Sequence, residues 1–327
     1  MIRSFLITVC AVVGSGCSAL LYLPPEKADR PEGARFVTDD LPRFYEAVDA
    51  AGAPPGGAPL DPGVFAERYL NAGTRGLRAF DALTIGGAER LAVVVTRRRA
   101  YYDAIRADVL RLREGSAALD SVRAALGRLE RVYPAASFPD VTFVVGRMNT
   151  GGTVSSRGLL IGVELFMRGP ETPTDGFTAW QLSNTRSPDL LPHVVVHEVV
   201  HAQQRLLTLT RGSLLSRALV EGGADFVASL ATGDVIAPEA HEYGLRNEAE
   251  VWQEFAARMD GGDLSGWFYG SPSDPSRPAD LGYFVGYRIA EAYYNLSTDK
   301  ESAIRDIIRL RDPRALLEES GYPDSFD

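Results

Sequence analysis

The sequence predicts an α+β fold that is mainly α-helical, with a small β-sheet placed before a central helix. Apolar residues recur at helical spacing over most of the chain, and the strongest strand candidates are two β-branched runs at 141–145 and 159–163. The chain has 327 residues, 45% of them hydrophobic, which is enough for one large domain or two modest domains with a real core.

The elements follow the chain in a simple order. A short helix is expected at 41–50, and a loop rich in proline and glycine follows it at 51–59. Further helices precede the two strands, and the remaining ones follow them, separated by a loop at 261–279 that is rich in Gly, Ser, Pro and Asp. These helices are expected at 62–72, 87–113, 116–131, from about 188 to 211, at 213–232, from 241, at 282–294 and as a pair within 300–320.

The N-terminus reads as an export signal. Residues 1–17 join a short positive region to a short apolar one, and small residues precede Cys17, so we expect a signal peptide and lipidation of Cys17. Cleavage elsewhere, such as after Ala19, is the alternative. Residues 18–35 would then be a tether, and 36–327 a single domain facing the periplasm or the exterior. The remaining cysteine is Cys10, so the exported domain would hold no disulfide.

Charge narrows the classes of partner. The net charge is −9, and arginines and lysines form no cluster interleaved with aromatic residues. This balance argues against binding to a phosphate backbone, so no nucleic-acid partner is expected.

The most informative stretch is His193-Val-Val-Val-His197-Glu198-Val-Val-His201. On an α-helix His197 and His201 lie one turn apart on the same face, the spacing at which two imidazoles reach one ion. Glu198 lies beside them and can take a proton from an attacking water. His193 is about 12 Å from His201 along the axis at 1.5 Å per residue, too far to share that ion.

A third ligand must therefore come from another segment. Glu221 is the best candidate, because it is polar amid apolar neighbours on the helix expected at 213–232. Asp225 follows one turn later on the same face. A buried pair of carboxylates needs compensation, which a divalent ion and a histidine N–H would supply. Asp225 would then orient one of the ligand histidines.

The types and spacing of these residues resemble those of a known group of enzymes. A His-Glu-x-x-His motif followed by Glu-x-x-x-Asp on the next helix resembles the gluzincin metallopeptidases. The resemblance implies a zincin-like fold, one Zn²⁺ per chain on His197, His201 and Glu221, Glu198 as general base, and Asp225 as the acid beside the ligands.

More of the chain is similar to a narrower group, the bacterial zinc-dependent proteases related to gliding-motility lipoproteins. In that group fold and metal are better defined than substrate. The similar segments are 65–80, 101–106, 144–153 and 282–288.

In zinc peptidases a substrate commonly pairs with the edge strand of a small sheet that precedes the metal helix. The segment 147–156 is expected to be that edge or its loop, and an ordinary hairpin connection is equally compatible with it. Two adjacent glycines there would allow a close approach of the backbone. The candidate substrate-binding residues are Asn149, Gly151, Gly152 and Thr153.

A tyrosine near the metal would donate to the oxyanion formed during hydrolysis. Tyr283 and Tyr287 are the candidates, and simple packing is the alternative for both. Arg288 is a weaker candidate for binding a substrate carboxylate, and His241 is expected to be a surface or capping residue.

Together these features predict a zinc-dependent hydrolase, an exported or membrane-anchored metallopeptidase acting on peptides or proteins. Two alternatives remain open. One is a zinc-binding envelope lipoprotein that acts by partner binding without catalysis, and the other is a peptidoglycan amidase with the same zinc chemistry. An intact Glu198 argues against the first, because a structural zinc site needs no base there.

Overall fold

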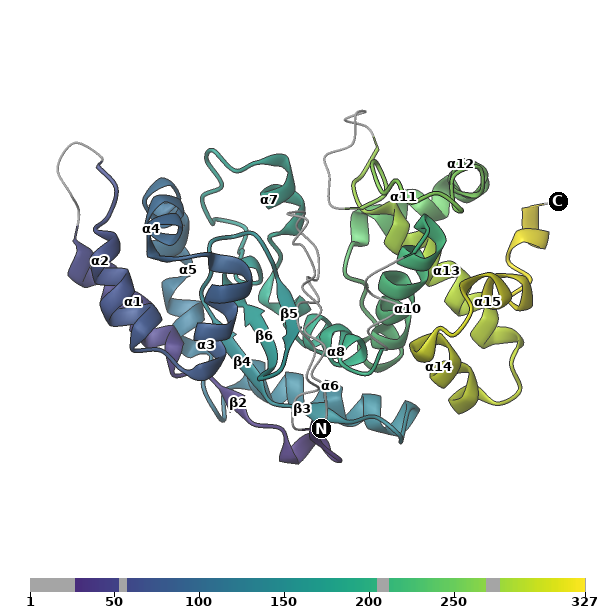
Figure 1. Ribbon diagram of the computed structural model, residues 1–327, viewed down its shortest axis with the longest axis horizontal. Helices are drawn as coiled ribbons and strands as arrows, with labels where there is room; N and C mark the ends of the chain where they lie inside the picture. Colours follow the sequence, from purple (N-terminus) through teal and green to yellow (C-terminus); the bar gives the residue numbers. More distant parts are fainter. Residues whose placement is uncertain (1–26, 53–57, 205–211, 269–276, 327) are drawn as a thin grey trace, which may run out of the picture.

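The computed structural model describes residues 27–52, 58–204, 212–268 and 277–326. A small sheet lies near the middle of an elongated molecule, with helices of the N-terminal part on one side and helices of the C-terminal part on the other (Figure 1). Helices predominate and the sheets are small, so the α+β, mainly helical class is confirmed.

The described residues form one four-stranded sheet of order β2-β4-β6-β5. Strand β4 pairs in parallel with both β2 and β6, and β5 pairs antiparallel with β6. The segment that joins the two predicted strands therefore contains a strand of its own, β5, at the edge of the sheet. The strands are β2 (Phe36–Val37), β4 (Val141–Val144), β5 (Gly152–Ser155) and β6 (Gly158–Gly162), and a separate pair joins β1 (Lys27–Ala28) to β3 (Phe138–Pro139).

The first group of helices packs around buried aromatic side chains beside this sheet. The helix expected at 87–113 is two helices, because the backbone at Arg98 leaves the helical region with φ −116° and ψ 23°. The elements are α1 (Asp40–Ala51), α2 (Pro62–Phe65), the π-helix η3 (Ala66–Asn71), α3 (Arg75–Phe80), the π-helix η4 (Asp81–Ile85), α4 (Ala88–Arg97), α5 (Arg99–Arg111) and α6 (Ala117–Val132). Their buried aromatic residues include Phe44, Tyr45, Phe65, Tyr69 and Tyr102.

The second group of helices follows the sheet in the chain and contains the predicted motif. The 3₁₀ turn η5 (Val163–Leu165), α7 (Ala179–Asn184) and the turn η6 (Pro188–Leu190) lead to α8 (Leu191–His201). The rest are α10 (Leu214–Thr232), α11 (Pro238–Arg246), α12 (Glu248–Ala256), α13 (Leu281–Leu296), α14 (Lys300–Arg309), α15 (Pro313–Glu319) and the turn η7 (Pro323–Phe326).

Helices α10 and α13 approach each other unusually closely, and two glycines make this possible. A Cβ atom on Gly222 would lie 2.3 Å from the backbone nitrogen of Tyr287, and one on Gly286 would lie 1.8 Å from the carbonyl oxygen of Ala218. No side chain fits at either position. The contact fixes the position of α10 against α13 at Gly222, and therefore the position of its neighbour Glu221.

The part of the expected tether that the structure describes, residues 27–35, is packed on the domain. Strand β1 pairs with β3, and the turn η1 (Pro31–Gly33) accepts a hydrogen bond from Arg123 at the Pro31 carbonyl, 2.8 Å away. The Lys27 ammonium donates to the carbonyl of Ala202 at 2.5 Å, just past the C-terminal end of α8. The predicted signal segment and Cys17 lie outside the described residues.

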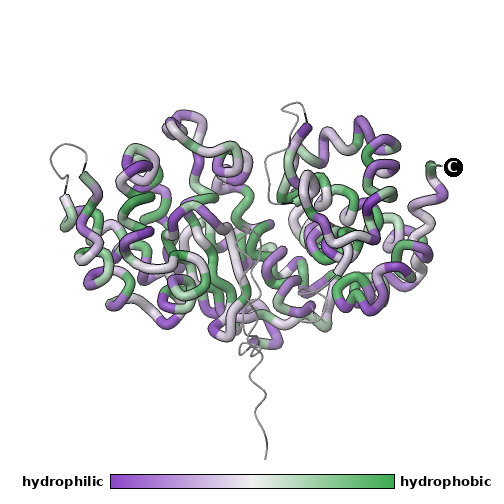
Figure 2. The backbone as a smooth tube through the Cα atoms, turned by 45° about the horizontal axis from the view of Figure 1, so that its top comes forward, coloured by the Kyte–Doolittle hydropathy of each residue, from purple (hydrophilic) through white to green (hydrophobic). Residues whose placement is uncertain are grey.

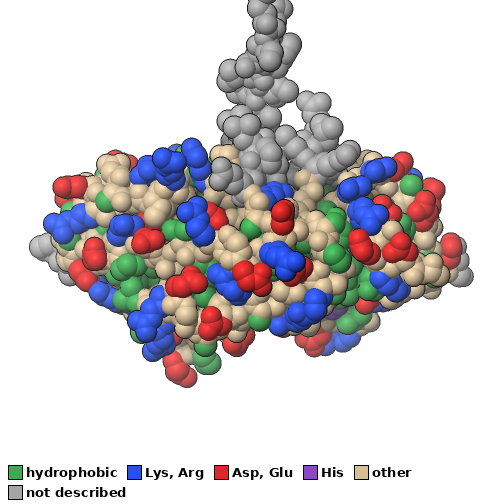
Figure 3. All heavy atoms as spheres, turned by 90° about the horizontal axis from the view of Figure 1, so that it is seen from below, with side chains coloured by type: hydrophobic (Ala, Val, Ile, Leu, Met, Phe, Trp, Pro, Cys, Tyr) green, Lys and Arg blue, Asp and Glu red, His purple; other side chains and the backbone are tan. Residues whose placement is uncertain are grey.

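Hydrophobic and hydrophilic stretches alternate along the helices throughout the molecule (Figure 2). On the face seen in Figure 3, positive and negative side chains are interspersed. Within the described ranges, no helix combines the length and apolar character needed to cross a membrane.

Candidate metal centre and pocket

Helix α8 carries the predicted motif at the centre of the molecule. Ser187 caps the 3₁₀ turn η6, which occupies the first residues of the expected helix, and Pro192 lies in the first turn of α8. The α-helix begins at Leu191 and ends at His201, so it is shorter than the sequence predicts, and residues 205–211 of the expected helix lie outside the described residues. The three histidines of α8 recur every fourth residue, which places them along one face. His193, His197 and His201 are all at most 2% exposed.

The donor atoms of His197, His201 and Glu221 converge on one small region. The Nε2 atoms of the two histidines are 2.9 Å apart, and the Oε2 atom of Glu221 lies 3.2 Å from His201 Nε2 and 3.7 Å from His197 Nε2. Donors held 2.0–2.1 Å from a tetrahedral zinc ion lie about 3.3 Å apart. The three atoms therefore have the spacing that such an ion requires.

Neighbouring side chains orient two of these three residues. The amide nitrogen of Gln204 donates to the Val220 carbonyl at 3.0 Å, so its oxygen faces His201 Nδ1 at 2.7 Å and accepts a hydrogen bond from it. This bond leaves the Nε2 lone pair of His201 for a metal. Arg217 lies 3.4 Å from Glu221 Oε1, while the other oxygen, Oε2, faces the histidines.

The electrostatics of this cluster call for positive charge. Burial alone would lower the pKa of His201, but the Glu221 carboxylate outweighs burial and raises the pKa to about 9. Burial would raise the pKa of Glu221, but His201, a hydrogen bond from His197 and Arg217 together hold that pKa well below its usual value. A divalent cation held by these residues would supply the positive charge that this arrangement favours.

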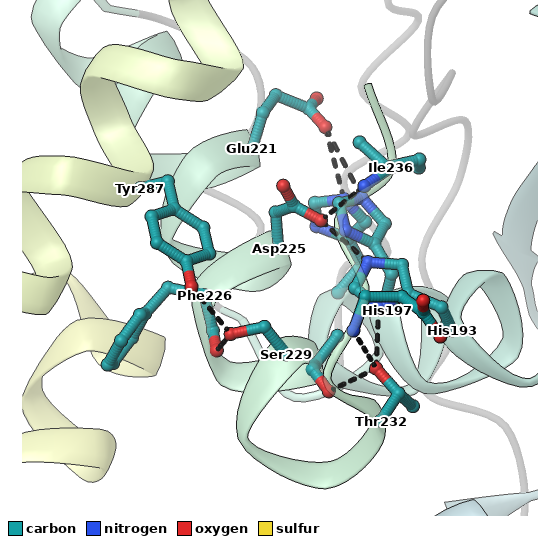
Figure 4. A network of polar contacts seen from close by, with 12 residues as sticks. His193, His197, Glu221, Asp225, Phe226, Ser229, Thr232, Ile236 and Tyr287 are labelled. Carbon is teal, nitrogen blue, oxygen red and sulfur yellow. Dashed lines mark hydrogen bonds and ion pairs between the residues drawn. The ribbon is translucent and has the colours of Figure 1, made fainter. Parts of the chain in front are cut away.

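Asp225 has a different partner from the one that the sequence predicts. Its Oδ1 atom lies 2.6 Å from His193 Nε2 and accepts a hydrogen bond from the backbone of Ile236 at 2.9 Å. The other ring nitrogen of His193 lies 2.8 Å from the Thr232 hydroxyl, so His193 is held at both ends (Figure 4).

Asp225 nevertheless lies close to one of the candidate metal ligands. One ring nitrogen of His197 and one carboxylate oxygen of Asp225 lie within 4.8 Å of each other, in a group that also includes His193. The Nδ1 atom of His197 is buried and has no hydrogen-bond partner among the residues that the structure describes. The predicted hydrogen bond to a ligand histidine is thus replaced by one to His193, because the two histidines occupy successive turns of the same face of α8.

A pocket opens beside the cluster and contains Glu198. Strand β5 approaches this residue closely at Gly152, because a Cβ atom there would lie 2.6 Å from Glu198 Oε1 and would force the glutamate side chain to move. The backbone of the edge strand therefore passes directly over the carboxylate. The pocket is lined by Thr150, Gly151, Gly152, Leu165, Phe166, Trp180, Asn184, Arg186, Leu190, Val194, His197, Glu198, Ile236, Ala237, Asp280 and Tyr283.

The four residues expected to bind substrate divide into two pairs. Gly151 and Gly152 line the pocket, at the start of the edge strand. Asn149 instead donates to the Thr84 carbonyl at 3.1 Å, and Thr153 is buried within β5. Neither belongs to the pocket lining, because alternate residues of a strand point to opposite faces and the loop before β5 turns Asn149 inward toward η4.

The two candidate tyrosines also differ in position. Tyr283 lines the pocket, and its ring centroid is 6.3 Å from that of His197. The hydroxyl of Tyr287 lies 3.0 Å from the hydroxyl of Ser229, and its ring packs on Phe226 (Figure 4). Tyr287 is therefore turned away from the pocket.

Two further residues have roles in packing. Arg288 forms ion pairs with Glu248, at 2.7 Å, and with Glu291, so it does not face the candidate metal centre. His241 is half-buried rather than on the surface, with its ring 4.7 Å from that of Tyr287 and 5.4 Å from that of Phe284.

Sequence reasoning missed Gln204 and the role of His193. Gln204 follows His201 by three residues, so helical spacing points to the contact, although it lies just past the end of α8. His193 precedes His197 by one turn, and its burial beside a carboxylate depends on how α10 crosses α8.

Comparison with protein-family models, with curated proteins and with solved structures finds no match for this chain.

Proposed function

We propose that this protein is a zinc-dependent hydrolase, an exported metallopeptidase that cleaves peptide bonds. The observation that carries the proposal is the convergence of His197 Nε2, His201 Nε2 and Glu221 Oε2, at 2.9, 3.2 and 3.7 Å, beside a pocket that contains Glu198. Two histidines and a glutamate are a ligand set of catalytic zinc sites that keep one position open.

The zinc ion would supply a Lewis acid that lowers the pKa of water and polarises a carbonyl group. Each protein residue then has a separate task. Glu198, which does not belong to the converging set, accepts the proton of the attacking water and passes it to the leaving amine. Tyr283 at the pocket wall donates its hydroxyl to the oxyanion.

The edge strand supports a peptide as the substrate. Among the described residues, strand β5 pairs with β6 alone, and its first residue passes over Glu198. The outer edge of such a strand can offer backbone donors and acceptors to an extended chain, which would bring a peptide bond over the carboxylate. A peptide or a protein segment in extended form is therefore the proposed substrate.

The proposed location follows from the sequence of the N-terminus. A signal at 1–17 and lipidation of Cys17 would anchor the protein in the bacterial envelope, with the domain facing the periplasm or the exterior. Metabolic labelling with a palmitate analogue tests this, and a Cys17→Ser variant that is labelled as strongly as the parent would rule out lipidation at this cysteine.

The decisive experiment compares the parent protein with Glu198→Gln. Zinc content is measured for both proteins, and both are then incubated with a mixed peptide library. We expect one zinc per chain in both, cleavage by the parent, and at least about 10³-fold slower cleavage by the variant, because the proton acceptor is lost. Glu242→Gln, the same change on the exposed surface of α11, is the matched control.

Three outcomes separate the possibilities. Normal activity of Glu198→Gln would remove the mechanism. Absence of zinc from the parent would remove the metal centre. Equimolar zinc in both proteins with cleavage by neither would favour a zinc-binding lipoprotein that acts through a partner.

A further inference from the structure

The pocket has a direction, which residues of α8 and of the turn η6 before it define. Leu190, Val194 and Glu198 are spaced four residues apart and all line the pocket, so they form a row along one helix face. The row ends at Glu198 beside the candidate metal centre and begins about 12 Å away, at 1.5 Å per residue. Its middle is apolar, with Phe166 and Trp180 among the other lining residues.

Arg186 lies before the start of this row. Its backbone is held on both sides, since its N–H donates to the Leu165 carbonyl at 2.6 Å and its own carbonyl accepts from Arg168 at 2.9 Å. The side chain lines the pocket and is only 12% exposed. It is the only lysine or arginine among the described residues that line the pocket.

The guanidinium of Arg186 is largely uncommitted. It has five N–H donors, and within the described ranges it uses one of them, for a hydrogen bond of 2.6 Å to Glu239. Glu239 lies in the first turn of α11, and its side chain is 62% exposed. An ion pair with so exposed a partner contributes little and exchanges readily, and it shows that a carboxylate can reach this guanidinium.

We propose that Arg186 binds a carboxylate of the substrate, two to four residues from the cleaved bond. This inference rests on the proposed peptidase function. An extended peptide advances about 3.3 Å per residue, so three or four residues span the row from Glu198, and the length of the arginine side chain shortens that span. The apolar middle of the row suits a hydrophobic side chain between the cleaved bond and the carboxylate. The carboxylate comes either from an Asp or Glu side chain or from the C-terminus of a short peptide.

The test uses four matched peptides built on one sequence that the parent cleaves. The first carries Glu at the third residue from the cleaved bond and a C-terminal amide, and the second carries Gln there. The third ends in a free carboxylate at that position, and the fourth in an amide. Values of kcat/KM are measured for the parent, Arg186→Gln and Glu239→Gln, and thermal melting confirms that each variant is folded.

We expect the parent to prefer one or both carboxylate peptides over their amide forms by about 10- to 100-fold, the range for a hydrogen bond to a charged group. The Glu/Gln pair and the free-acid/amide pair distinguish the two sources of the carboxylate. Arg186→Gln should lose the preference, because its kcat/KM for each carboxylate peptide should fall to its value for the matching amide peptide. Glu239→Gln should keep or increase it, because a competing carboxylate is removed.

The outcomes separate this inference from the proposed function. Cleavage by the parent without any preference, or an equal loss of preference in both variants, would overturn the role of Arg186 and leave the peptidase intact. If the parent cleaves nothing, fluorescence anisotropy of the same peptides bound to the zinc-loaded protein tests the inference directly. Binding that favours carboxylates and depends on Arg186 would then support it although the peptidase proposal had failed, and binding without that dependence would refute it.

Discussion

Two fully buried glutamates in this protein have opposite surroundings. Glu164, in η5, accepts hydrogen bonds from the backbone N–H groups of Gly146 at 2.8 Å and Met148 at 3.0 Å. Burial raises its pKa to about 7, although these bonds pull it back. Glu221, in α10, faces two histidines and Arg217, and its pKa is well below the usual value.

The difference shows how a buried carboxylate is used. Backbone amides can solvate Glu164 but bring no charge, so it fastens the loop of Gly146 and Met148, which leads to the edge strand. The residues around Glu221 supply positive charge at one point, which is the requirement of a cation site. By this comparison, changes near Glu164 should affect stability, and changes near Glu221 should affect metal binding.

The largest effect is expected from Glu221→Gln. The substitution keeps the shape of the side chain but removes the negative charge between His197 and His201. Zinc affinity should fall by on the order of 10³-fold or more, beyond the roughly 10- to 100-fold typical of residues that only support ligands. Competition with a chelator measures the affinity. Unchanged zinc stoichiometry and affinity would show that the third ligand is another residue.

Glu164→Gln should leave zinc binding intact and change the pH dependence of stability. The pKa of Glu164 is raised in the folded protein, from an ordinary 4.5 to about 7, so its contribution is complete below pH 4.5 and is lost as pH rises to about 7. Between pH 4.5 and pH 7, the difference in free energy of unfolding between parent and variant should change by roughly 3 kcal/mol.

Denaturant titrations over this range, with the exposed Glu318→Gln as a control, measure that change. A constant difference between parent and Glu164→Gln would mean that Glu164 does not titrate in this window. A large loss of zinc from Glu164→Gln would show that Glu164, like Glu221, supports metal binding.

Tyr283→Phe and Tyr287→Phe test which tyrosine donates to the oxyanion beside the candidate metal centre. Tyr283 lines the pocket, whereas the Tyr287 hydroxyl is bonded to Ser229. We expect kcat to fall by about 10²-fold for Tyr283→Phe, the scale of one lost oxyanion donor, and to change little for Tyr287→Phe. Steady-state kinetics on one peptide are sufficient, and the reverse ranking would exclude the assignment of Tyr283.

The smallest effect is expected from His193→Asn. His193 holds Asp225, and a carboxylate oxygen of Asp225 lies within 4.8 Å of a ring nitrogen of His197. Loosening Asp225 should weaken zinc binding by about 10- to 100-fold. His241→Asn, at a half-buried histidine packed on aromatic rings, is the matched control. Equal zinc affinity for parent and His193→Asn would show that the contact between His193 and Asp225 serves packing and does not support metal binding.

Much of the candidate site could be predicted from local sequence. The i, i+4 spacing of His197 and His201 places them on one helix face in any fold, and Ser213 and Gly233 begin and end α10 as predicted. The sequence left open whether the segment 147–156 forms an edge strand or a loop, because its glycines and polar residues give no strand pattern. The structure has strand β5 there, and its place at the edge depends on pairing with β6. The break at Arg98 also left no signal in the apolar periodicity.

The sequence by itself determined the mainly helical class, the helices around the motif and the placement of His197 and His201 on one helix face, because these follow from backbone geometry within a few residues. Only the tertiary structure decided that Asp225 meets His193, that Tyr283 rather than Tyr287 faces the pocket, and that Arg186 lies at its far end. The first outcome depends on how α10 crosses α8, and the third on the backbone hydrogen bonds that hold Arg186 to Leu165 and Arg168. The second depends on where α13 lies against α10, which is set by the close contact at Gly222 and Gly286 between segments more than 60 residues apart. No local pattern encodes the rotation of one helix against another, because it is fixed by packing between distant side chains.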